Sequence, residues 1–257
     1  MRVIILHGRL RSYLAFFCLL SLSTLTHSHE INIDGKLDDP SWDLAEEYTK
    51  FYESFPFTLK KPSSFQKVLI LEDSNGIYLG FINQQEKEQV RANKHERDDE
   101  MSNADKVGVS IDFDGNGLVA YSFSVSAGGS ISDGIYRNEN EINYDWDADW
   151  KSDVYIDEDY WFAEIFIPWT IAPMKSIDGP SRAVKINFWR LLASEWKVHS
   201  SIKGNARQEK YMSLFHEYEF NNYSISKIDF FPYLTLSDDR VLNEDSKKVG
   251  AEIFWNI

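Results

Sequence analysis

The chain has 257 residues, of which 43% are hydrophobic, 15% aromatic and 26% charged, and its formal net charge is −14. This composition is that of a globular protein and excludes a chain that is disordered throughout. The acidic excess argues against nucleic acid or an anionic membrane surface as the partner, because phosphate groups would repel it.

The first 28 residues have the pattern of a secretory signal peptide. Arg2, Arg9 and Arg11 form a basic start, the apolar run Tyr13–Leu22 follows, and small polar residues lead to a cleavage site after Ser28. The apolar run is too short to span a bilayer and has the length of a signal-peptide core. The sequence therefore predicts an exported protein.

Removal of this signal peptide would change both the charge and the cysteine content. The mature chain would hold 24 basic residues against 41 acidic ones, a formal charge of −17. The one cysteine, Cys18, lies within the signal peptide, so the mature chain would have no disulfide bond.

The first part of the mature chain combines turns, a short helical pattern and two strands. Asp34-Gly35 is typical of a turn, and Pro40 begins a helical pattern that includes Trp42. Residues 65–71 read as a strand, and Ile77–Phe81 alternates as its partner after the turn EDSNG.

The strongest local pattern is a hairpin over Val107–Val125. Apolar residues occupy every second position on both sides of the turn DGNG, which is typical of two antiparallel strands with one buried face. These apolar positions are Val107, Val109, Ile111 and Phe113 before the turn, and Val119, Tyr121, Phe123 and Val125 after it.

Two further strands alternate in the same way, at Trp161–Pro168 and Ala183–Leu191, whereas residues 196–217 are polar and are expected to form a loop. With about seven to nine strands, little helix and no βαβ repeat, the pattern predicts an all-β, antiparallel β-sandwich of the jelly-roll or immunoglobulin-like kind.

The chain changes character near residue 223. The runs KIDFFPYLTLSDD and KKVGAEIFWNI predict two more strands, and the sequence ends within that pattern. We therefore expect three parts: a signal peptide at 1–28, a β-sandwich at 29–222, and the start of a second, truncated β domain at 223–257. A complete outer-membrane barrel needs at least eight strands, so this tail cannot form one by itself.

An ordered set of motifs resembles the carbohydrate-binding module family 9-like domain. The resemblance covers roughly residues 31–220 and rests on these segments: IDGKLDDPSW (33–42), IYLGF (77–81), YSFSVSAGG (121–129), WDADW (146–150), WFAEIFIPW (161–169), and Asn187 with Arg190. The tail is similar to the start of the barrel-like domain of unknown function that follows this module in Gram-negative bacterial proteins.

This resemblance implies a β-sandwich that binds poly- or oligosaccharides, frequent calcium sites, and association with glycoside hydrolases. It also implies a periplasmic or outer-membrane-associated location, through the missing C-terminal domain. Members of the family hold a sugar between two tryptophans, and neither maps onto a specific residue of this sequence from the motifs alone.

The aromatic residues in and near WDADW are the candidates for sugar binding. An aromatic ring can stack on the apolar face of a pyranose while nearby carboxylates accept hydrogen bonds from its hydroxyl groups. The alternative is that Trp146 and Trp150 are packing residues. The candidate set is Tyr136, Tyr144, Trp146, Trp150 and, further along, Trp196.

Calcium is the one metal ion that the acidic loops suggest. Asp112, Asp114 and Asn116 match the first half of an EF-hand loop, but its twelfth position is Phe123 rather than glutamate. A tight hairpin turn explains the same residues, because Asp, Asn and Gly tolerate its dihedral angles. A second acidic group, Asp145, Asp147 and Asp149, reads as a calcium loop, a catalytic carboxylate pair or a solvated loop.

No motif predicts an enzyme. The sequence has no G-x-S-x-G, no H-E-x-x-H and no cysteine nucleophile, and its mature histidines, which include His199 and His216, have no metal-ligand spacing and are expected at the surface. We therefore expect an exported, non-catalytic carbohydrate-binding module that serves polysaccharide breakdown.

Two alternatives remain open. A structural domain of an outer-membrane barrel protein predicts that Trp146 and Trp150 are buried and that no aromatic platform is exposed. A glycoside hydrolase predicts two carboxylates about 5–10 Å apart in a cleft.

Overall fold

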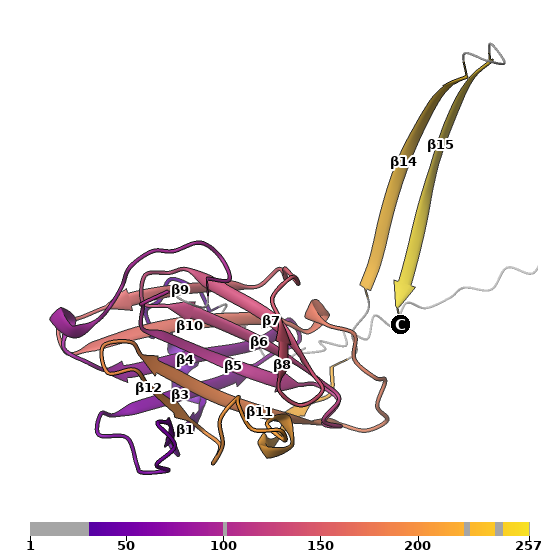
Figure 1. Ribbon diagram of the computed structural model, residues 1–257. Helices are drawn as coiled ribbons and strands as arrows, with labels where there is room; N and C mark the ends of the chain where they lie inside the picture. The colour runs from indigo at the N-terminus through magenta and orange to yellow at the C-terminus, as the bar shows by residue number, and fades with distance from the viewer. Residues whose placement is uncertain (1–30, 100–101, 224–226, 240–243, 257) are drawn as a thin grey trace, which may run out of the picture.

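The computed structural model describes residues 31–99, 102–223, 227–239 and 244–256. The predicted signal peptide, with Cys18, lies outside the described residues. Within them, strands dominate, and the helices are 3₁₀ turns of three to five residues, η1(Pro40–Leu44), η2(Lys87–Gln89), η3(Trp169–Ile171) and η4(Met212–Leu214) (Figure 1). None of these described helices has the length and apolar character to cross a bilayer.

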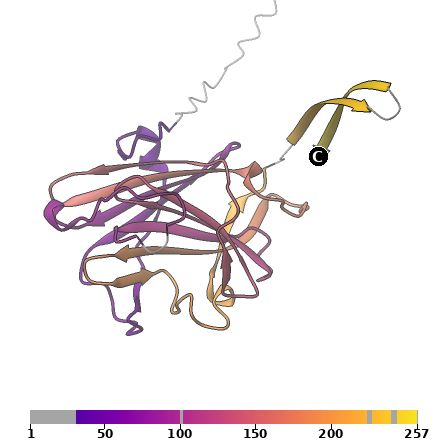
Figure 2. The same ribbon diagram turned by 45° about the horizontal axis from the view of Figure 1, so that its top comes forward.

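Two antiparallel sheets pack face to face, and one of them is strongly curled (Figure 2). This confirms the predicted all-β sandwich. The five-stranded sheet has the order β1(Glu46–Tyr48), β3(Gln66–Glu72), β4(Gly76–Gln84), β10(Tyr160–Pro168), β9(Lys151–Ile156). The eight-stranded sheet has the order β2(Tyr52–Phe55), β12(Lys197–Ser200), β11(Ser181–Leu192), β5(Lys106–Asp112), β6(Val119–Ser126), β7(Ile131–Arg137), β8(Glu141–Asn143), with β13(His216–Asn221) also paired to β11.

The predicted hairpin at 107–125 is confirmed as β5 and β6. Lys106 lies opposite Ser126 and Ile111 lies opposite Tyr121, so the two arms pair over their whole length. The apolar phase of both strands points to the other sheet, as the period-two pattern requires. Val107, Val109, Ile111, Phe123 and Val125 are fully buried there.

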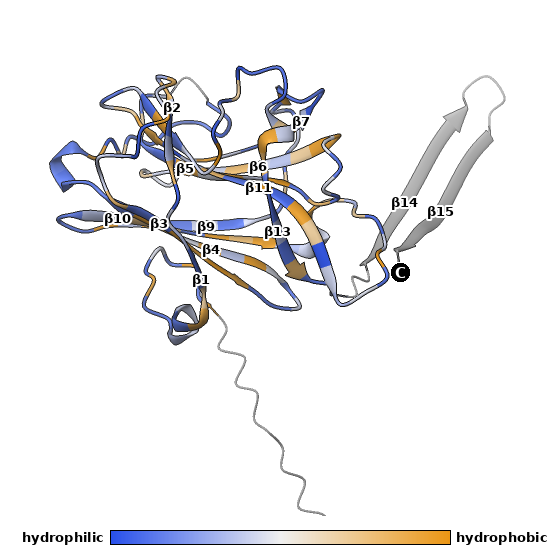
Figure 3. Cartoon of the chain, turned by 90° about the horizontal axis from the view of Figure 1, so that it is seen from below, coloured by the Kyte–Doolittle hydropathy of each residue, from blue (hydrophilic) through white to orange (hydrophobic). Residues whose placement is uncertain are grey.

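The core lies between the two sheets and is built mainly from strands that alternate strictly in sequence. On β10 the residues Trp161, Ala163, Ile165 and Ile167 are fully buried, and β11 contributes Val184, Ile186 and Phe188. Burial of each large apolar side chain contributes roughly 1.5–3 kcal/mol. Figure 3 shows the same division, with hydrophobic stretches on the strands and mostly hydrophilic connections.

The structure contains more strands than the seven to nine expected from the sequence. The two sheets hold five and eight described strands. β1 and β8 have three residues each, which is too short for a periodic signal. The expectation of a loop at 196–217 is wrong in part, because residues 197–200 form β12 and pair with both β11 and β2.

The polar face of β5 and β6 is also covered, which a simple alternating pattern does not predict. Ser110 and Asp112 are as buried as the apolar residues between them. A second apolar cluster packs over this outer side of the eight-stranded sheet; its members are Ala120, Tyr136, Ile202, Tyr211, Met212 and Phe215.

The N-terminal motif is fastened to the five-stranded sheet by the buried carboxylate of Glu164. Its Oε2 accepts hydrogen bonds from the backbone N–H groups of Asp34 and Gly35, both at 2.8 Å. Its Oε1 accepts one from Nε1 of Trp42 at 3.0 Å. Burial raises the pKa of Glu164 to about 7, although these three donors oppose the shift.

A buried arginine links the two sheets at one end of the sandwich. Arg190 of β11 donates from Nη2 to Oε1 of Gln85 at 2.7 Å and to the carbonyl of Gln84 at 3.2 Å. Burial lowers its pKa to about 10, and nearby Asp105 partly offsets that effect. Asp105 in turn accepts the backbone N–H of Ala193 at 2.7 Å, so this end of β11 is held from both sides.

The two strands predicted in the tail are present as β14(Lys227–Asp239) and β15(Glu244–Asn256). They pair with one another over thirteen positions, from Lys227 opposite Asn256 to Asp239 opposite Glu244, and form a separate two-stranded sheet. The proposed domain boundaries at 28 and 222 stay predictions.

Candidate functional site

A pocket of about 430 Å³ opens on the outer side of the eight-stranded sheet, away from the five-stranded sheet. Its floor comes from alternate residues of the strands, those whose neighbours point into the core. Its walls come from the segments after β7 and after β12. The strand residues that line it include Phe55, Lys106, Ser122, Ser124, Ser132, Trp189, Leu191 and Val198.

Trp189 lies in the floor of the pocket, and its ring is accommodated by a glycine on the neighbouring strand. Trp189 pairs with Gly108 across β11 and β5. A Cβ atom at position 108 would lie 2.5 Å from Cζ2 of Trp189 and 2.7 Å from the carbonyl oxygen of Phe123. The absence of a side chain at 108 is therefore what allows the indole to occupy this position.

Three serines of β6 and β7 line the pocket with small side chains, which leaves room above the sheet. Ser122, Ser124 and Ser132 present only hydroxymethyl groups toward the pocket. Ser122 and Ser110 are hydrogen-bonded to each other through their Oγ atoms at 3.2 Å. A row of small polar side chains beside an indole provides both depth and hydrogen-bonding groups.

One wall is formed by β8 and the residues around it. Gly134 of β7 allows this wall to approach, since a Cβ atom there would lie 2.8 Å from the carbonyl oxygen of Asn143 and 3.1 Å from Cδ1 of Tyr144. Tyr144 and Asn140 line the pocket from this side. The stretch 204–207 closes the opposite side, through Gly204, Asn205, Ala206 and Arg207.

A buried polar network holds the segment after β12 against the sheet. Asn187 of β11 donates from Nδ2 to the hydroxyl oxygen of Tyr211 at 2.9 Å, and its Oδ1 accepts from the hydroxyls of Ser200 at 2.7 Å and Ser201 at 3.0 Å. Burial raises the pKa of Tyr211 to about 12, so its hydroxyl stays protonated. Tyr211 also packs against Tyr136, with ring centroids 5.4 Å apart.

Trp196 lies at the rim, in the turn between β11 and β12. Its side chain is 57% exposed, and its φ angle is 56°, in the left-handed region that a bulky residue rarely adopts. Such a conformation costs of order 1–3 kcal/mol and persists only where the surroundings impose it. The turn therefore holds an indole in solvent at the mouth of the pocket.

The structure brings three of the five predicted sugar-binding residues together. Tyr136, Tyr144 and Trp196 all line the pocket, although they come from β7, the segment after β8 and the β11–β12 turn. Trp146 and Trp150 do not line it. The assignment of sugar binding to these residues stays a prediction.

Trp150 and Trp146 pack against the core of the sandwich. Trp150 is 7% exposed, and its ring lies 5.6 Å from that of Phe123. Trp146 is half-buried against the same cluster, with its ring 5.1 Å from that of Tyr121. The motif WDADW therefore supplies packing residues at these two positions, as the alternative interpretation expected.

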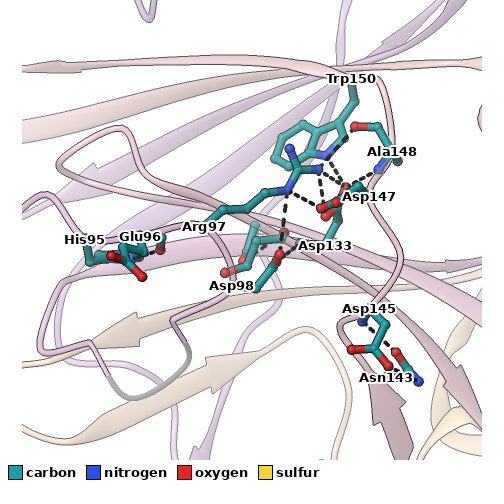
Figure 4. A network of polar contacts seen from close by, with 12 residues as sticks. His95, Glu96, Arg97, Asp98, Asp133, Asn143, Asp145, Asp147, Ala148 and Trp150 are labelled. Carbon is teal, nitrogen blue, oxygen red and sulfur yellow. Dashed lines mark hydrogen bonds and ion pairs between the residues drawn. The ribbon is translucent and has the colours of Figure 1, made fainter.

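Beneath Trp150 lies an acidic group bridged by an arginine (Figure 4). Asp98, Asp133 and Asp147 each place an oxygen within 4.8 Å of the others. Arg97 lies among them, with Nη2 2.8 Å from Asp133, Nε 2.9 Å from Asp147 and Nε 3.6 Å from Asp98. Burial raises the pKa of Asp98, and the charge of nearby Asp133 adds to the effect.

These carboxylates fit the guanidinium of Arg97 rather than a metal ion. The arginine takes the position between the oxygens that a cation would need, and Asp133 also accepts hydrogen bonds from Nε1 of Trp150 and the N–H of Ala148, both at 2.9 Å. Although burial alone would lower the pKa of Arg97, Asp133 and Asp147 raise it above its ordinary value.

The EF-hand-like loop that begins at Asp112 forms the turn between β5 and β6. Asp112 accepts from the backbone N–H of Asp114 at 3.1 Å and from that of Gly117 at 2.6 Å, and Asn116 accepts from the N–H of Leu118 at 2.9 Å. Both carboxylate oxygens of Asp112 are thus bonded within the loop. Calcium binding by Asp112, Asp114 and Asn116 stays a prediction that no contact of these residues favours.

Two histidines that were expected at the surface are not there. His199 is buried on β12, with Nδ1 2.9 Å from Oε1 of Gln66, and burial lowers its pKa to about 4. His216 is partly buried beside Tyr48, and burial lowers its pKa to about 4 as well. The correction follows from the missed strand β12, which turns His199 toward the other sheet.

The comparisons with known proteins agree with this architecture. No family model and no curated protein matches the sequence. A proposed carbohydrate-binding protein from Bacteroides uniformis superposes with a TM-score of 0.53 at 15% identity, over 69% of this chain and 87% of that chain. The chain shares that fold. At this identity, the likeness extends to the fold alone.

Carbohydrate-binding module family 9 is also among the structural neighbours. A family 9 module from Caldicellulosiruptor kristjanssonii in complex with glucose gives a TM-score of 0.49, over 73% of this chain and 89% of that chain. The cellotriose complex gives 0.46, over 73% and 87%, and both are 14% identical to this chain. This is the same family that the sequence motifs resemble.

Several pocket residues were missed by reasoning from the sequence. In the sequence, Trp189 alternates with Val184, Ile186 and Phe188 and so falls on the other face of its strand, and a tryptophan on that face is the signal that points to an aromatic on the outer side of the sheet. Asn140, Asn205 and Arg207 carry no such signal. Asn140 lies in the connection between β7 and β8, and the other two lie in the segment after β12, so only the packing of these two segments over the sheet brings them to the pocket.

Proposed function

We propose that this chain is a carbohydrate-binding module that takes a sugar into the pocket on the outer side of the eight-stranded sheet. The observation on which this rests is the lining itself: two tryptophans, Trp189 and Trp196, together with small hydroxyl and amide side chains. Indole faces stack on the apolar faces of pyranose rings, and hydroxyl and amide groups hydrogen-bond to sugar hydroxyls.

The size and character of the pocket support this assignment. A volume of about 430 Å³ lies in the range of small-ligand sites, which combine apolar walls with a few placed polar groups. Trp189 on the floor and Trp196 at the mouth are proposed as the two sugar-holding tryptophans. Because the buried area is small, we expect dissociation constants of about micromolar or weaker.

The pocket favours binding over catalysis. Among its described lining residues the one carboxylate is Asp133, and its oxygens are bonded to Arg97, Trp150 and Ala148. Hydrolysis of a glycosidic bond needs a second carboxyl group at a fixed separation. We therefore propose a non-catalytic module that serves an associated polysaccharide-degrading enzyme.

A purely structural domain is supported by one observation and opposed by another. It predicts buried tryptophans at 146 and 150, and Trp150 is indeed in the core. It also predicts that no aromatic platform is exposed, whereas Trp196 is 57% exposed beside an aromatic-lined pocket. The second observation favours ligand binding.

The test is calorimetric titration of the full chain with a panel of soluble oligosaccharides. Trp189→Ala and Trp196→Ala are expected to weaken binding about fivefold or more, since each stacked ring contributes of order 1 kcal/mol or more. Tyr155→Ala is the matched control, because Tyr155 is a 40% exposed aromatic on the other sheet. A folded protein that binds none of the panel would support the structural role instead.

We also propose that the chain is exported to the periplasm or to the outer membrane of a Gram-negative bacterium. The support is the basic and apolar pattern of residues 1–28. Cell fractionation with N-terminal sequencing of the mature protein checks this; a mature chain that begins near residue 29 is the expected result.

A further inference from the structure

The charge around the pocket has the opposite sign to that of the chain. The whole sequence has a net charge of −14, yet residues 197–210, which run along one side of the pocket, contain four basic residues and a single acidic one. Of the four, Lys197 is ion-paired with Glu195 and Glu53. Of the described side chains that line the pocket, the charged ones are Lys106, Arg207 and Asp133. A positive patch on an acidic protein is a feature that a ligand of negative charge would select.

The one lining carboxylate does not cancel this charge. The side chain of Asp133 is fully buried and turned toward Arg97 and Trp150, away from the pocket. Lys106 is fixed at the base of the pocket, where its Nζ donates to the carbonyl oxygen of Asp99 at 3.0 Å. Arg207 is therefore the one exposed charged residue among the described residues that line the pocket.

Arg207 is the cation that is placed to meet a ligand. Its guanidinium carbon lies 5.0 Å from the centroid of the Phe55 ring, and the residue is exposed. The neighbouring Lys203 is held in the same way, 5.2 Å from the centroid of the Tyr52 ring. Among the ion pairs between described residues, none involves either cation.

The contact with Phe55 leaves N–H donors of the guanidinium available. A phenyl ring attracts the charge of the cation but offers no oxygen or nitrogen acceptor to its N–H groups. Phe55 and Arg207 both line the pocket, so those donors lie within reach of a ligand there. A planar fork of N–H donors matches a carboxylate in two parallel hydrogen bonds.

We propose that the pocket selects an acidic sugar, a uronic acid residue whose carboxylate binds the guanidinium of Arg207. This rests on the proposed carbohydrate-binding function. The ring of the sugar stacks on the indole groups, and its carboxylate lies toward the 204–207 side of the pocket, where Asn205 offers a further donor. Trp189 then contributes binding to any sugar, and Arg207 discriminates between acidic and neutral ones.

The test compares two forms of one ligand, tri-galacturonic acid and its fully methyl-esterified derivative, titrated into the full chain. The acid is expected to bind roughly tenfold or more tightly at low salt, because the charge-assisted pair is lost in the ester. That preference should shrink as ionic strength rises. Equal affinity for acid and ester would overturn the inference and leave the proposed function intact.

Two variants separate Arg207 from general electrostatics. Arg207→Gln should remove the preference for the acid while the ester binds as before. Lys210→Gln removes an exposed positive charge from the same segment but not from the pocket lining, and it should keep most of the preference. A preference that survives Arg207→Gln would overturn the assignment of this residue. Absence of binding to either form and to neutral oligosaccharides would overturn the proposed function itself.

Discussion

The indole of Trp189 stands where a side chain at Gly108 would be: a Cβ atom there would lie 2.5 Å from its Cζ2 atom. The two residues face each other across β11 and β5, where Trp189 lines the pocket floor. The indole of Trp189 can lie at this place in the floor because Gly108, its partner on β5, has no side chain.

This pairing predicts that Gly108→Ala impairs sugar binding without unfolding the protein. The added methyl group must displace the Trp189 ring, and it also meets the carbonyl oxygen of Phe123 at 2.7 Å. We expect an affinity loss of about tenfold and a stability loss of about 1–3 kcal/mol, as for other overpacked sites. Calorimetry and urea unfolding measure the two effects.

The matched control for that variant is Ser110→Ala, on the same face of the same strand. It removes the hydrogen bonds of Ser110 with Ser122 and Tyr211 but adds no atom beneath Trp189. Its affinity should stay within about threefold of the wild type, since only neutral hydrogen bonds beneath the pocket are involved. Equal losses in both variants would show that the floor responds to any change in β5, and not to the position of the indole.

A second prediction concerns Trp150, which the sequence suggests as a sugar-binding residue and the structure places in the core. Trp150→Phe keeps an aromatic ring against Phe123 but removes the hydrogen bond from Nε1 to Asp133. We expect a free energy of unfolding lower by about 1–3 kcal/mol, because Asp133 is buried and loses a donor.

The same variant should bind sugar as the wild type does, because Trp150 does not line the pocket. Parallel thermal unfolding and calorimetry decide this. Loss of sugar binding at unchanged stability would indicate that the sugar-binding site lies at the WDADW motif, and would contradict the pocket that we propose.

The fold was predictable where strands alternate strictly. Val107 to Ile111 on β5 and Trp161 to Ile167 on β10 face a dry core on one side, so their period of two is visible in the sequence. β7 and β12 were not predicted, because their outer faces are covered by other segments and their residues include serines and a buried histidine. Long-range covering of this kind leaves no local periodicity.

The site was predictable only in part, for a related reason. Tyr136, Tyr144 and Trp196 were singled out as aromatic residues in polar surroundings, and the structure places all three at the pocket. Trp150 satisfied the same criterion and is buried, because Asp133 supplies a buried partner for its N–H that lies 17 positions away in sequence. Sequence context does not reveal such a partner.

A third prediction follows from the buried carboxylate of Glu164. Its pKa is raised to about 7 in the folded protein, so the folded state holds a proton that the unfolded state releases at lower pH. The contribution of this group to stability is therefore full below its unfolded pKa, near 4.5, and is lost as the pH rises toward 7, by at most about 3 kcal/mol.

The variant Glu164→Gln tests this because it cannot titrate. Its free energy of unfolding, measured by urea unfolding from pH 5 to pH 8, should gain relative to the wild type as the pH rises and then stay level above about pH 7. Glu158→Gln, an exposed position before the same strand, serves as the control. A constant difference between Glu164→Gln and the wild type over this range would show that Glu164 is ionised in the folded protein throughout.

The last prediction concerns His199, which acts in the opposite direction over the same range of pH. Burial lowers its pKa to about 4, so below pH 6.5 the unfolded chain takes up a proton that the folded protein excludes. The contribution of this group to stability is full above about pH 6.5 and falls as the pH drops toward 4.

His199→Asn keeps an amide near Gln66 but does not titrate, so its free energy of unfolding should fall less than that of the wild type between pH 7 and pH 5. In the double variant with Glu164→Gln, the free energy of unfolding should lose the pH dependence that each of the two groups contributes. The effects should add, because the two groups lie on different sheets and share no contact among the described hydrogen bonds. Identical slopes for His199→Asn and the wild type would mean that this histidine takes up its proton over the same range of pH in the folded protein as in the unfolded chain.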